Sequence, residues 1–437
     1  PDLAQTDANC DGLDGDLNDV IFVREGGNDR APGTSVETAV GSFQAAMEIA
    51  ANSERNWVLV SGNHTLVPID PWLVGPSVAG GYNADFTMRT GRSSIALPNT
   101  GLVLQGTADA VWQSLALTAE PGDPHSVVLT LEGTQGLVLD DCFLRSRAGT
   151  HGLEGGDGAS GGAGQPGGSG GTGGPAMASR GSAGTSVCGG DGGRGGTGSL
   201  TANPPASARG EDAALLRGRD QAEGGAAGNG NNSSGSAGQT STPGSTGSKG
   251  ADGSVDPVWQ NRTIVLQPGA TGNSGTKGGG GGGGGGAGPW RVGPRWFSGG
   301  AGGGGGSGGC PGLGGDGGTA AGSSIALVLD QAAVTLKGGR IIASAGGTGG
   351  GGGSGGSGGA GGSAGQGGSP RGGNGGAGGR GGNGGQGGSG AAGASISVLC
   401  VGASVLTNEG ATLQKSNATA GVNGAPDGAS AQTFGCD

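Results

Sequence analysis

The chain has 437 residues, of which 118 are glycine and 20 are proline, and its formal net charge is −11. Glycine offers no side chain to a hydrophobic core, so this composition excludes an ordinary globular enzyme over the full length. The low proline count excludes a collagen triple helix, and the acidic balance without a basic block argues against nucleic acid as a partner.

An acidic segment opens the chain, and we assign residues 1–19 to it. Oxygen-bearing side chains recur there at alternate positions and a glycine follows the third, as at the start of a calcium-binding loop. A solvated acidic turn is the alternative, because Asn18 stands where the loop's final glutamate is expected. The candidate ligands, with calcium as the candidate cofactor, are Asp7, Asn9, Asp11, Leu13, Asp14 and Asp16.

Residues 20–148 have an ordinary composition, and short runs of Val, Ile and Leu between turns predict short strands. One helix is expected among them. Ser42 is a suitable N-cap, and the residues that follow carry an apolar stripe at Phe43, Met47 and Ala50.

Three apolar segments repeat one pattern, in which three short strands are followed by Ala-Gly. They lie at 127–149, 325–346 and 396–421. Three strands in a repeat of this size predict a right-handed parallel β-helix, in which each coil buries its inward residues against its neighbours. The glycine-rich tracts leave the chain after the third strand of a coil, so we expect them to be insertions from one corner of the β-helix.

The glycine-rich tracts have a period of three. Glycine recurs at every third position, or X-Gly-Gly holds, in 155–173, 244–253, 269–284, 298–318, 345–362 and 371–388. A polyproline II helix repeats every three residues and has no internal hydrogen bonds, so its backbone groups must pair with neighbouring legs, which bare glycine edges allow to approach closely. We therefore predict an ordered bundle of polyglycine II legs; disordered spacers are the alternative.

These patterns predict an all-β fold, namely a right-handed parallel β-helix with an N-terminal capping helix and a polyglycine II bundle inserted from one corner. The expected segments are the acidic lead (1–19), β-helix (20–148), a glycine-rich insertion (149–322), a β-helix coil (323–344), a glycine-rich hairpin insertion (345–390) and the final coil with the C-terminus (391–437).

Six cysteines, a start without Met and the lack of a long apolar run predict a secreted protein whose signal peptide has been removed and which has no transmembrane segment. Up to three disulfides can form, and the pairing is open. Cys188 and Cys310 both occupy X positions of triplets, which suggests a staple between legs. The disulfide candidates are Cys10, Cys142, Cys188, Cys310, Cys400 and Cys436.

No catalytic constellation stands out. Asp140 and Asp141 are adjacent, but neighbouring residues of a strand point to opposite faces, which argues against a pair of catalytic carboxylates. Three widely spaced histidines, His64, His125 and His151, do not suggest a metal cluster. Aromatic residues between legs are expected either to plug the ends of the bundle or to form a platform for sugar or surface binding. They are Trp259, Trp290, Trp296 and Phe297.

Two resemblances follow from these motifs. The segment 7–16, the run 21–23, the expected helix and the segment 80–86 look like the start of secreted bacterial right-handed β-helix proteins of the pectin-lyase-like class. That resemblance implies the fold and secretion. The triplet tracts are similar to the polyglycine II bundles of glycine-rich antifreeze proteins and of phage tail-tip adhesins; this similarity is architectural and carries no site residues.

We therefore expect a non-enzymatic structural protein that is extracellular or on the cell surface. The first hypothesis is a self-assembling filament or surface-fibre subunit, whose partners are copies of itself. The second is an adhesin that binds a cell surface or polysaccharide, or an ice-binding protein that uses the small X residues from Ala345 to Ala360. A polysaccharide lyase or hydrolase is the third.

Overall fold

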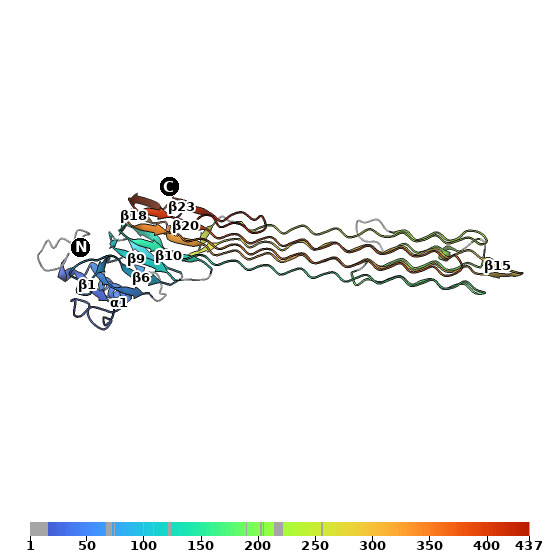
Figure 1. Ribbon diagram of the computed structural model, residues 1–437, viewed down its shortest axis with the longest axis horizontal. Helices are drawn as coiled ribbons and strands as arrows, with labels where there is room; N and C mark the ends of the chain where they lie inside the picture. Colours follow the sequence, from blue (N-terminus) through green and yellow to red (C-terminus); the bar gives the residue numbers. More distant parts are fainter. Residues whose placement is uncertain are drawn as a thin grey trace.

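The computed structural model describes residues 16–66, 72–73, 75–98, 100–107, 109–120, 124–188, 190–201, 203, 205–213, 222–254 and 257–436. These residues form a body of parallel β-sheets, from which long extended segments project to one side (Figure 1). Besides one α-helix, the described residues contain two short 3-10 helices, at Leu17–Asp19 and Ala206–Ala208. The chain is therefore all-β, as its composition and apolar runs predict.

The body contains three parallel sheets. The first is ordered β1 (Val20–Arg24), β2 (Trp57–Ser61), β5 (Ser77–Tyr82), β8 (Val111–Gln113), β11 (Leu137–Asp140), β18 (Ala333–Lys337) and β21 (Val405–Glu409). The second is ordered β23 (Ser430–Phe434), β20 (Ser395–Val401), β17 (Ser324–Asp330), β10 (Ser126–Gln135), β7 (Leu102–Thr107) and β4 (Trp72–Leu73). The third is ordered β22 (Thr412–Gln414), β19 (Arg340–Ile342), β12 (Phe143–Arg145), β9 (Leu115–Ala119), β6 (Ser93–Leu97) and β3 (Asn63–Thr65).

Consecutive strands alternate among the three sheets. Strands β10, β11 and β12 each lie in a different sheet, and so do β17, β18 and β19, and β20, β21 and β22. The three sequence repeats therefore pair strand by strand, and their inward residues meet in register. Leu129 lies opposite Leu327, for example, and Leu327 lies opposite Val398. The internal repeat found in the sequence is confirmed by these pairings.

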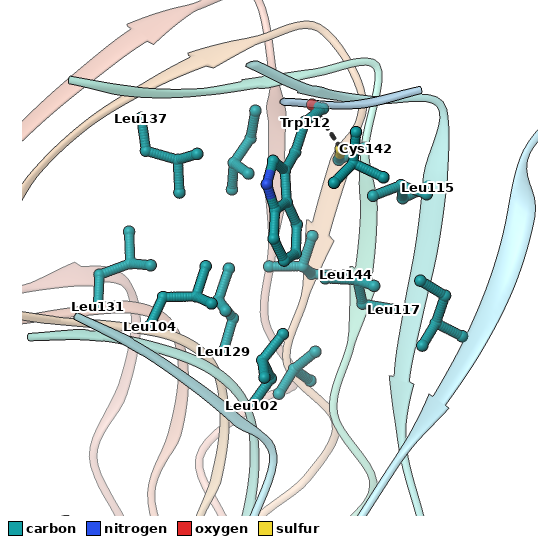
Figure 2. Packing of buried hydrophobic residues seen from close by; sticks show 14 of the residues in the cluster. Leu102, Leu104, Trp112, Leu115, Leu117, Leu129, Leu131, Leu137, Cys142 and Leu144 are labelled. Carbon is teal, nitrogen blue, oxygen red and sulfur yellow. Dashed lines mark hydrogen bonds between the residues drawn. The ribbon is translucent and has the colours of Figure 1, made fainter. Parts of the chain in front are cut away.

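The helix α1 (Phe43–Ala51) is confirmed, with the Ser42 hydroxyl accepting a hydrogen bond from the Ala45 amide at 3.2 Å. Its apolar stripe belongs to the main hydrophobic core, where Phe43 meets the ring of Trp112 edge-on with centroids 6.2 Å apart. Figure 2 shows the leucines of successive strands packed around Trp112. Helix α1 packs against β1 and β2 and thus covers the end of the body at which the sheets begin.

Two disulfides form among the described residues, Cys188–Cys310 and Cys400–Cys436. The expected staple between legs is therefore present. Cys142 does not join a disulfide: its thiol lies in the main core, and burial raises its pKa to about 12. The prediction that Cys142 is a disulfide candidate is therefore wrong, because its side chain points into the apolar interior (Figure 2). Cys10 lies outside the described residues.

Candidate functional site: the stalk and its two hairpins

The glycine-rich segments form extended legs, which we number in chain order and together call the stalk. They are leg 1 (149–173), leg 2 (179–185), leg 3 (190–199), leg 4 (209–213), leg 5 (222–229), leg 6 (235–253), leg 7 (269–287), leg 8 (298–322), leg 9 (345–368) and leg 10 (372–393). At a rise of about 3.1 Å per residue, a leg as long as leg 9 spans about 75 Å. The legs lie side by side along one direction (Figure 1).

Hydrogen bonds between legs recur every three residues. Leg 9 donates from every third amide, Gly347 to Gly368, to carbonyls of leg 8, with N···O distances of 2.7–2.9 Å. Leg 10 donates in the same way to leg 9 at 2.8–2.9 Å, and leg 1 donates to leg 9 at 2.8–3.0 Å. The backbone groups of the extended legs are thus satisfied by neighbouring legs rather than within each leg.

Leg 7 and leg 8 are each surrounded by six other legs in the half of the stalk far from the body. The amides of Gly302, Gly303 and Gly304 donate to legs 3, 10 and 1, at 2.8, 3.0 and 2.8 Å. The carbonyls of the same three residues accept from legs 2, 7 and 9. Three consecutive residues of leg 8 therefore contact six neighbours, and Gly281–Gly283 of leg 7 do the same.

Glycine is required in the surrounded legs because of space. A Cβ atom placed on Gly302, Gly303 or Gly304 would lie 1.9, 2.1 or 1.8 Å from a carbonyl oxygen of another leg. The amount of glycine accordingly follows the number of covered edges. Each leg has three edges, one for each residue of its three-residue turn. Leg 7 is surrounded over 278–286 and is all glycine there. Leg 9 has one edge in solvent and reads X-Gly-Gly, whereas leg 1 near the body has two edges in solvent and has glycine at every third position.

The disulfide Cys188–Cys310 marks the point at which the stalk widens. Legs 2 to 5 pack only on the far half, where leg 3 accepts hydrogen bonds from Gly302, Gly305 and Gly308 of leg 8. Cys188 lies at the turn between legs 2 and 3, and Cys310 lies on leg 8 immediately beyond these contacts. The bridge therefore fastens the outer group of short legs to a central leg.

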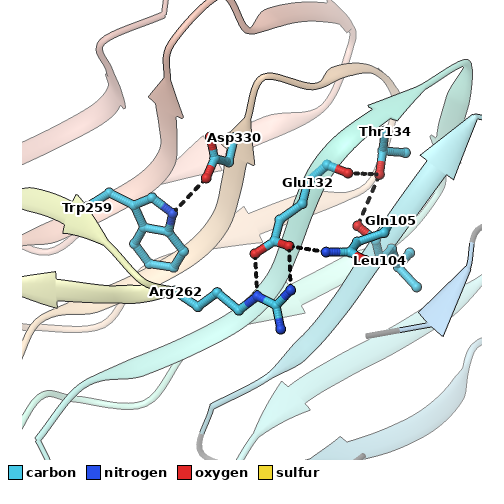
Figure 3. Close-up of polar contacts among 7 residues, drawn as sticks. All are labelled: Leu104, Gln105, Glu132, Thr134, Trp259, Arg262 and Asp330. Carbon is cyan, nitrogen blue, oxygen red and sulfur yellow. Dashed lines mark hydrogen bonds and ion pairs between the residues drawn. The ribbon is translucent and has the colours of Figure 1, made fainter. Parts of the chain in front are cut away.

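One hairpin joins the stalk to the body. Strands β13 (Val258–Gln260) and β14 (Thr263–Val265) connect legs 6 and 7 and lie on the outer face of β10 and β17 (Figure 3). The Arg262 guanidinium donates two hydrogen bonds to the Glu132 carboxylate at 2.6 and 2.8 Å. The indole N–H of Trp259 donates to Asp330 at 3.2 Å.

Apolar contacts strengthen this attachment. Ile264 of β14 and Leu266 are buried together with Val127, Ile325 and Ile396 of the second sheet. The outer face of that sheet is therefore a second hydrophobic layer that the hairpin and the ends of the legs cover. Trp259 is partly buried against this layer, at the end of the stalk that meets the body.

A second hairpin lies at the far end of the stalk and is called here the tip hairpin. Its strands β15 (Trp290–Val292) and β16 (Arg295–Phe297) connect legs 7 and 8 (Figure 1). Within it, the rings of Trp290 and Phe297 lie 5.5 Å apart, and the Arg291 guanidinium lies 5.8 Å from the ring centre of Trp296.

The tip hairpin is exposed, in contrast to the hairpin at the base. Trp296 retains 45% of its surface in solvent and Val292 retains 50%. The aromatic residues between legs thus differ in exposure: Trp259 is partly buried at the base, and Trp296 presents its ring to solvent. Sequence reasoning left this difference open, because both aromatic groups follow a glycine-rich leg.

Comparisons with protein-family models, with curated proteins and with solved structures give no match. In the part of the chain that the structure describes, no helix is long and apolar enough to cross a membrane. A function therefore has to be inferred from the stalk and its hairpins.

The remaining candidate residues have structural roles or lie outside the description. Of the candidate calcium ligands, Asp16 is described, and its side chain caps a 3-10 helix by accepting a hydrogen bond from the Asn18 amide. The others, Asp7, Asn9, Asp11, Leu13 and Asp14, lie outside the described residues. Within the described chain no three His, Cys, Asp or Glu side chains are grouped as metal ligands.

The two adjacent aspartates differ from expectation, since they do not share a strand. Strand β11 ends at Asp140, and Asp141 follows in a turn with φ of 49° and forms an ion pair with Arg92. Burial raises the pKa of Asp140, which Lys337 on the next strand partly offsets. Asp141 therefore holds a turn and is not the partner of Asp140 in a carboxylate pair.

The three histidines lie in separate places. A ring nitrogen of His64 lies 3.0 Å from the Ser61 carbonyl, and His125 accepts a hydrogen bond from the Ser323 amide at 2.9 Å. His151 of leg 1 lies 2.7 Å from the hydroxyl of Thr348 on leg 9. Each imidazole thus orders local backbone.

The row of small X residues on leg 9 does not stand alone on its face of the stalk. On one side, the Asp157 carboxylate of leg 1 accepts a hydrogen bond from the Ser354 amide at 2.7 Å. On the other side, Asn383 and Arg380 of leg 10 bind the amide and the carbonyl of Gly358 at 2.9 and 3.2 Å. Charged and amide side chains therefore flank the small residues on the same face.

Proposed function

We propose that this protein is a non-enzymatic extracellular stalk protein, in which a right-handed parallel β-helix is the base and a polyglycine II bundle holds the tip hairpin away from it. The observation that carries the proposal is the hydrogen bonding of legs 7 and 8 to six neighbours each. A helix with threefold screw symmetry presents three amides and three carbonyls per turn in six different directions, and the six neighbours satisfy all of them.

The parallel β-helix is supported by the order of the strands. Three strands per repeat pass from sheet to sheet in a fixed rotation, and each pairs in parallel with its equivalent in the next repeat. Insertion of legs after β12 and after β19 leaves this pairing intact, since β12 pairs with β19 and β19 with β22. The base can therefore carry a long insertion without losing its core.

Rigidity of the stalk is supported at both levels. Each leg is tied along its length to at least two others, and the pair Arg262–Glu132 with the buried Ile264 fixes the near end to the base. These contacts are typical of a rigid spacer, which holds its two ends about 75 Å apart, and not of a flexible linker.

Filament growth by stacking of bases is the second candidate. It is favoured by the last coil, where β21 is a sheet edge and Val405 is 57% exposed. Stacking also requires an open edge at the other end, and there β1 is already paired, because the amide of Phe22 donates to Gly33 and that of Arg24 to Val40. Stacking through the edge of the first sheet is thus blocked at that end, and this favours a single stalk over a filament.

The ice-binding hypothesis is disfavoured by the side chains that flank leg 9, since a flat face of small residues is interrupted by Asp157 and Arg380. An assay of thermal hysteresis checks this directly. Absence of hysteresis is expected.

Small-angle X-ray scattering of the purified protein tests the stalk. We expect a particle whose longest dimension exceeds that of the base by about 75 Å and whose scattering shows a rigid rod. A compact particle, or the scattering of a flexible chain, would overturn the proposal. Sedimentation velocity distinguishes a single stalk protein from a filament. The stalk protein sediments as one species at all concentrations, whereas the sedimentation coefficient of a filament increases with protein concentration.

A further inference from the structure

Several turns between legs lie together at the far end of the stalk. The Gly173 amide donates to Ser369, the Ser199 amide to Ala287, and the Asn232 amide to Pro289. These contacts join turns that are far apart in the sequence. The described tip residues are 174–178, 199–201, 230–234, 289–298 and 369–371, and we call them the tip surface.

The tip surface is positively charged on a chain of net charge −11. It carries Arg291, Arg295 and Arg371, which are all exposed, and its described residues include no Asp or Glu. The described carboxylates nearest to it in sequence are those of Glu223 on leg 5 and Asp191 on leg 3. Glu211 and Asp212 of leg 4 follow, and these two form ion pairs with Arg180 and Arg209. The described residues of the tip surface therefore favour an anionic ligand over a cationic one.

An aromatic ring lies among these charges. Trp296 is half-exposed and has the Arg291 guanidinium 5.8 Å from its ring centre. The indole N–H of Trp290 donates to the Ser298 carbonyl at 3.1 Å, and its ring packs on Phe297, so this second pair braces the hairpin. The tip hairpin thus presents one aromatic ring, together with cationic hydrogen-bond donors, on a braced support.

We propose that the tip surface binds an anionic polysaccharide. The C–H face of a sugar ring packs on the indole of Trp296, and the carboxylate or sulfate groups of the chain pair with Arg291 and Arg295. The inference rests on the proposed stalk function, because a binding site at the end of a spacer is useful only if the spacer is stiff.

The size of the tip hairpin favours a repeating polymer over a folded protein. A stable protein interface takes about 20–30 residues from each side. The tip hairpin, which carries Trp296, Arg291 and Arg295, extends beyond the other turns of the tip surface (Figure 1) and offers eight residues, Trp290 to Phe297. Each contact is therefore weak, and affinity must come from repeated charges along one ligand.

A membrane surface is less favoured by the same geometry. Phe297, the most apolar aromatic of the hairpin, packs on Trp290 instead of projecting. The ring that does project has a guanidinium beside it, and a cation is costly to place in hydrocarbon. Vesicle binding is accordingly an outcome that would count against the proposal.

The test uses the full chain and three immobilised acidic polymers, polygalacturonate, alginate and heparin, with dextran as the neutral polymer. We expect salt-sensitive binding to at least one acidic polymer and none to dextran. Trp296→Ala and the double variant Arg291→Gln/Arg295→Gln should each weaken binding about tenfold or more. The matched control Arg145→Gln, which removes an exposed arginine of β12 in the body, should leave binding unchanged.

Three results would overturn the proposal. They are no binding to any acidic polymer, equal binding by the tip variants and the wild type, and binding only to vesicles of phosphatidylglycerol. Scattering of the same samples separates this proposal from the stalk itself. If the protein scatters as a rigid rod but binds no polymer, the proposed tip ligand is refuted and the stalk is not. If it scatters as a compact particle, the stalk is refuted. A tip variant that still scatters as a rod has lost binding for a reason other than misfolding.

Discussion

Two adjacent glycines of leg 1 provide a direct test of why the stalk needs glycine. A Cβ atom on Gly161 would lie 2.1 Å from the Cys310 carbonyl oxygen of leg 8, whereas the nearest atom to a Cβ on Gly162 is the Cys310 sulfur at 3.9 Å. Neither residue has a positive φ, so alanine is sterically allowed in the backbone at both positions. Space between the legs is therefore the difference between them.

The same substitution should have opposite effects at these two positions. Gly161→Ala forces legs 1 and 8 apart by about 1 Å, since an ordinary Cβ contact is longer than about 3 Å, and should lower the free energy of unfolding by about 1–3 kcal/mol. Gly162→Ala restricts only the unfolded chain and should raise the free energy of unfolding by about 0.4–1 kcal/mol.

Differential scanning calorimetry of the two variants beside the wild type measures this contrast. The Gly161 variant should unfold at a lower temperature and the Gly162 variant at the same or a higher one. Equal effects of both variants would refute the reasoning, because independent or disordered legs do not distinguish the two positions.

Three further predictions concern the contacts that hold the stalk and the core of the body. Arg262→Ala leaves Glu132, which is 16% exposed, without its bidentate partner and should cost about 1–2 kcal/mol of stability, measured in a double-mutant cycle with Glu132→Gln. Cys188→Ser opens a loop of 122 residues and should lower the free energy of unfolding by about 2–5 kcal/mol. Amide exchange should become faster in leg 3 than in leg 9, and an equal increase in both legs would contradict the account. Cys142, whose pKa is about 12, should resist thiol reagents at pH 8 until the protein unfolds, and rapid labelling of the native protein would place it outside the core.

The body could be predicted well from the sequence because its information is local and periodic. The runs that start at Val127, Ile325 and Ile396 carry matching strands, and they pair in the structure as equivalents. The helix after Ser42 follows from its N-cap and apolar stripe. The turn at Asp141 was missed, since a left-handed residue other than glycine leaves little trace in a single sequence.

The lateral order of the legs could not be predicted, because a period of three describes each leg and not its neighbours. Which leg lies beside which is decided by contacts such as Gly304 to leg 1, across more than 100 residues. One signal was nonetheless present: the all-glycine run 278–286 marks a leg that is covered on every edge. The exposure of Trp296 and the burial of Trp259 likewise depend on which end of the stalk each hairpin occupies.

Residue-resolved amide hydrogen exchange by NMR tests the hydrogen-bonded stalk most directly. In leg 8 the amides of Gly302, Gly303 and Gly304 all donate to other legs, so all three should exchange slowly. In leg 1 over 154–163, the described backbone bonds between legs start only from Gly155, Gly158 and Gly161, so one slow amide in three is expected. Fast exchange throughout both legs would contradict the ordered stalk.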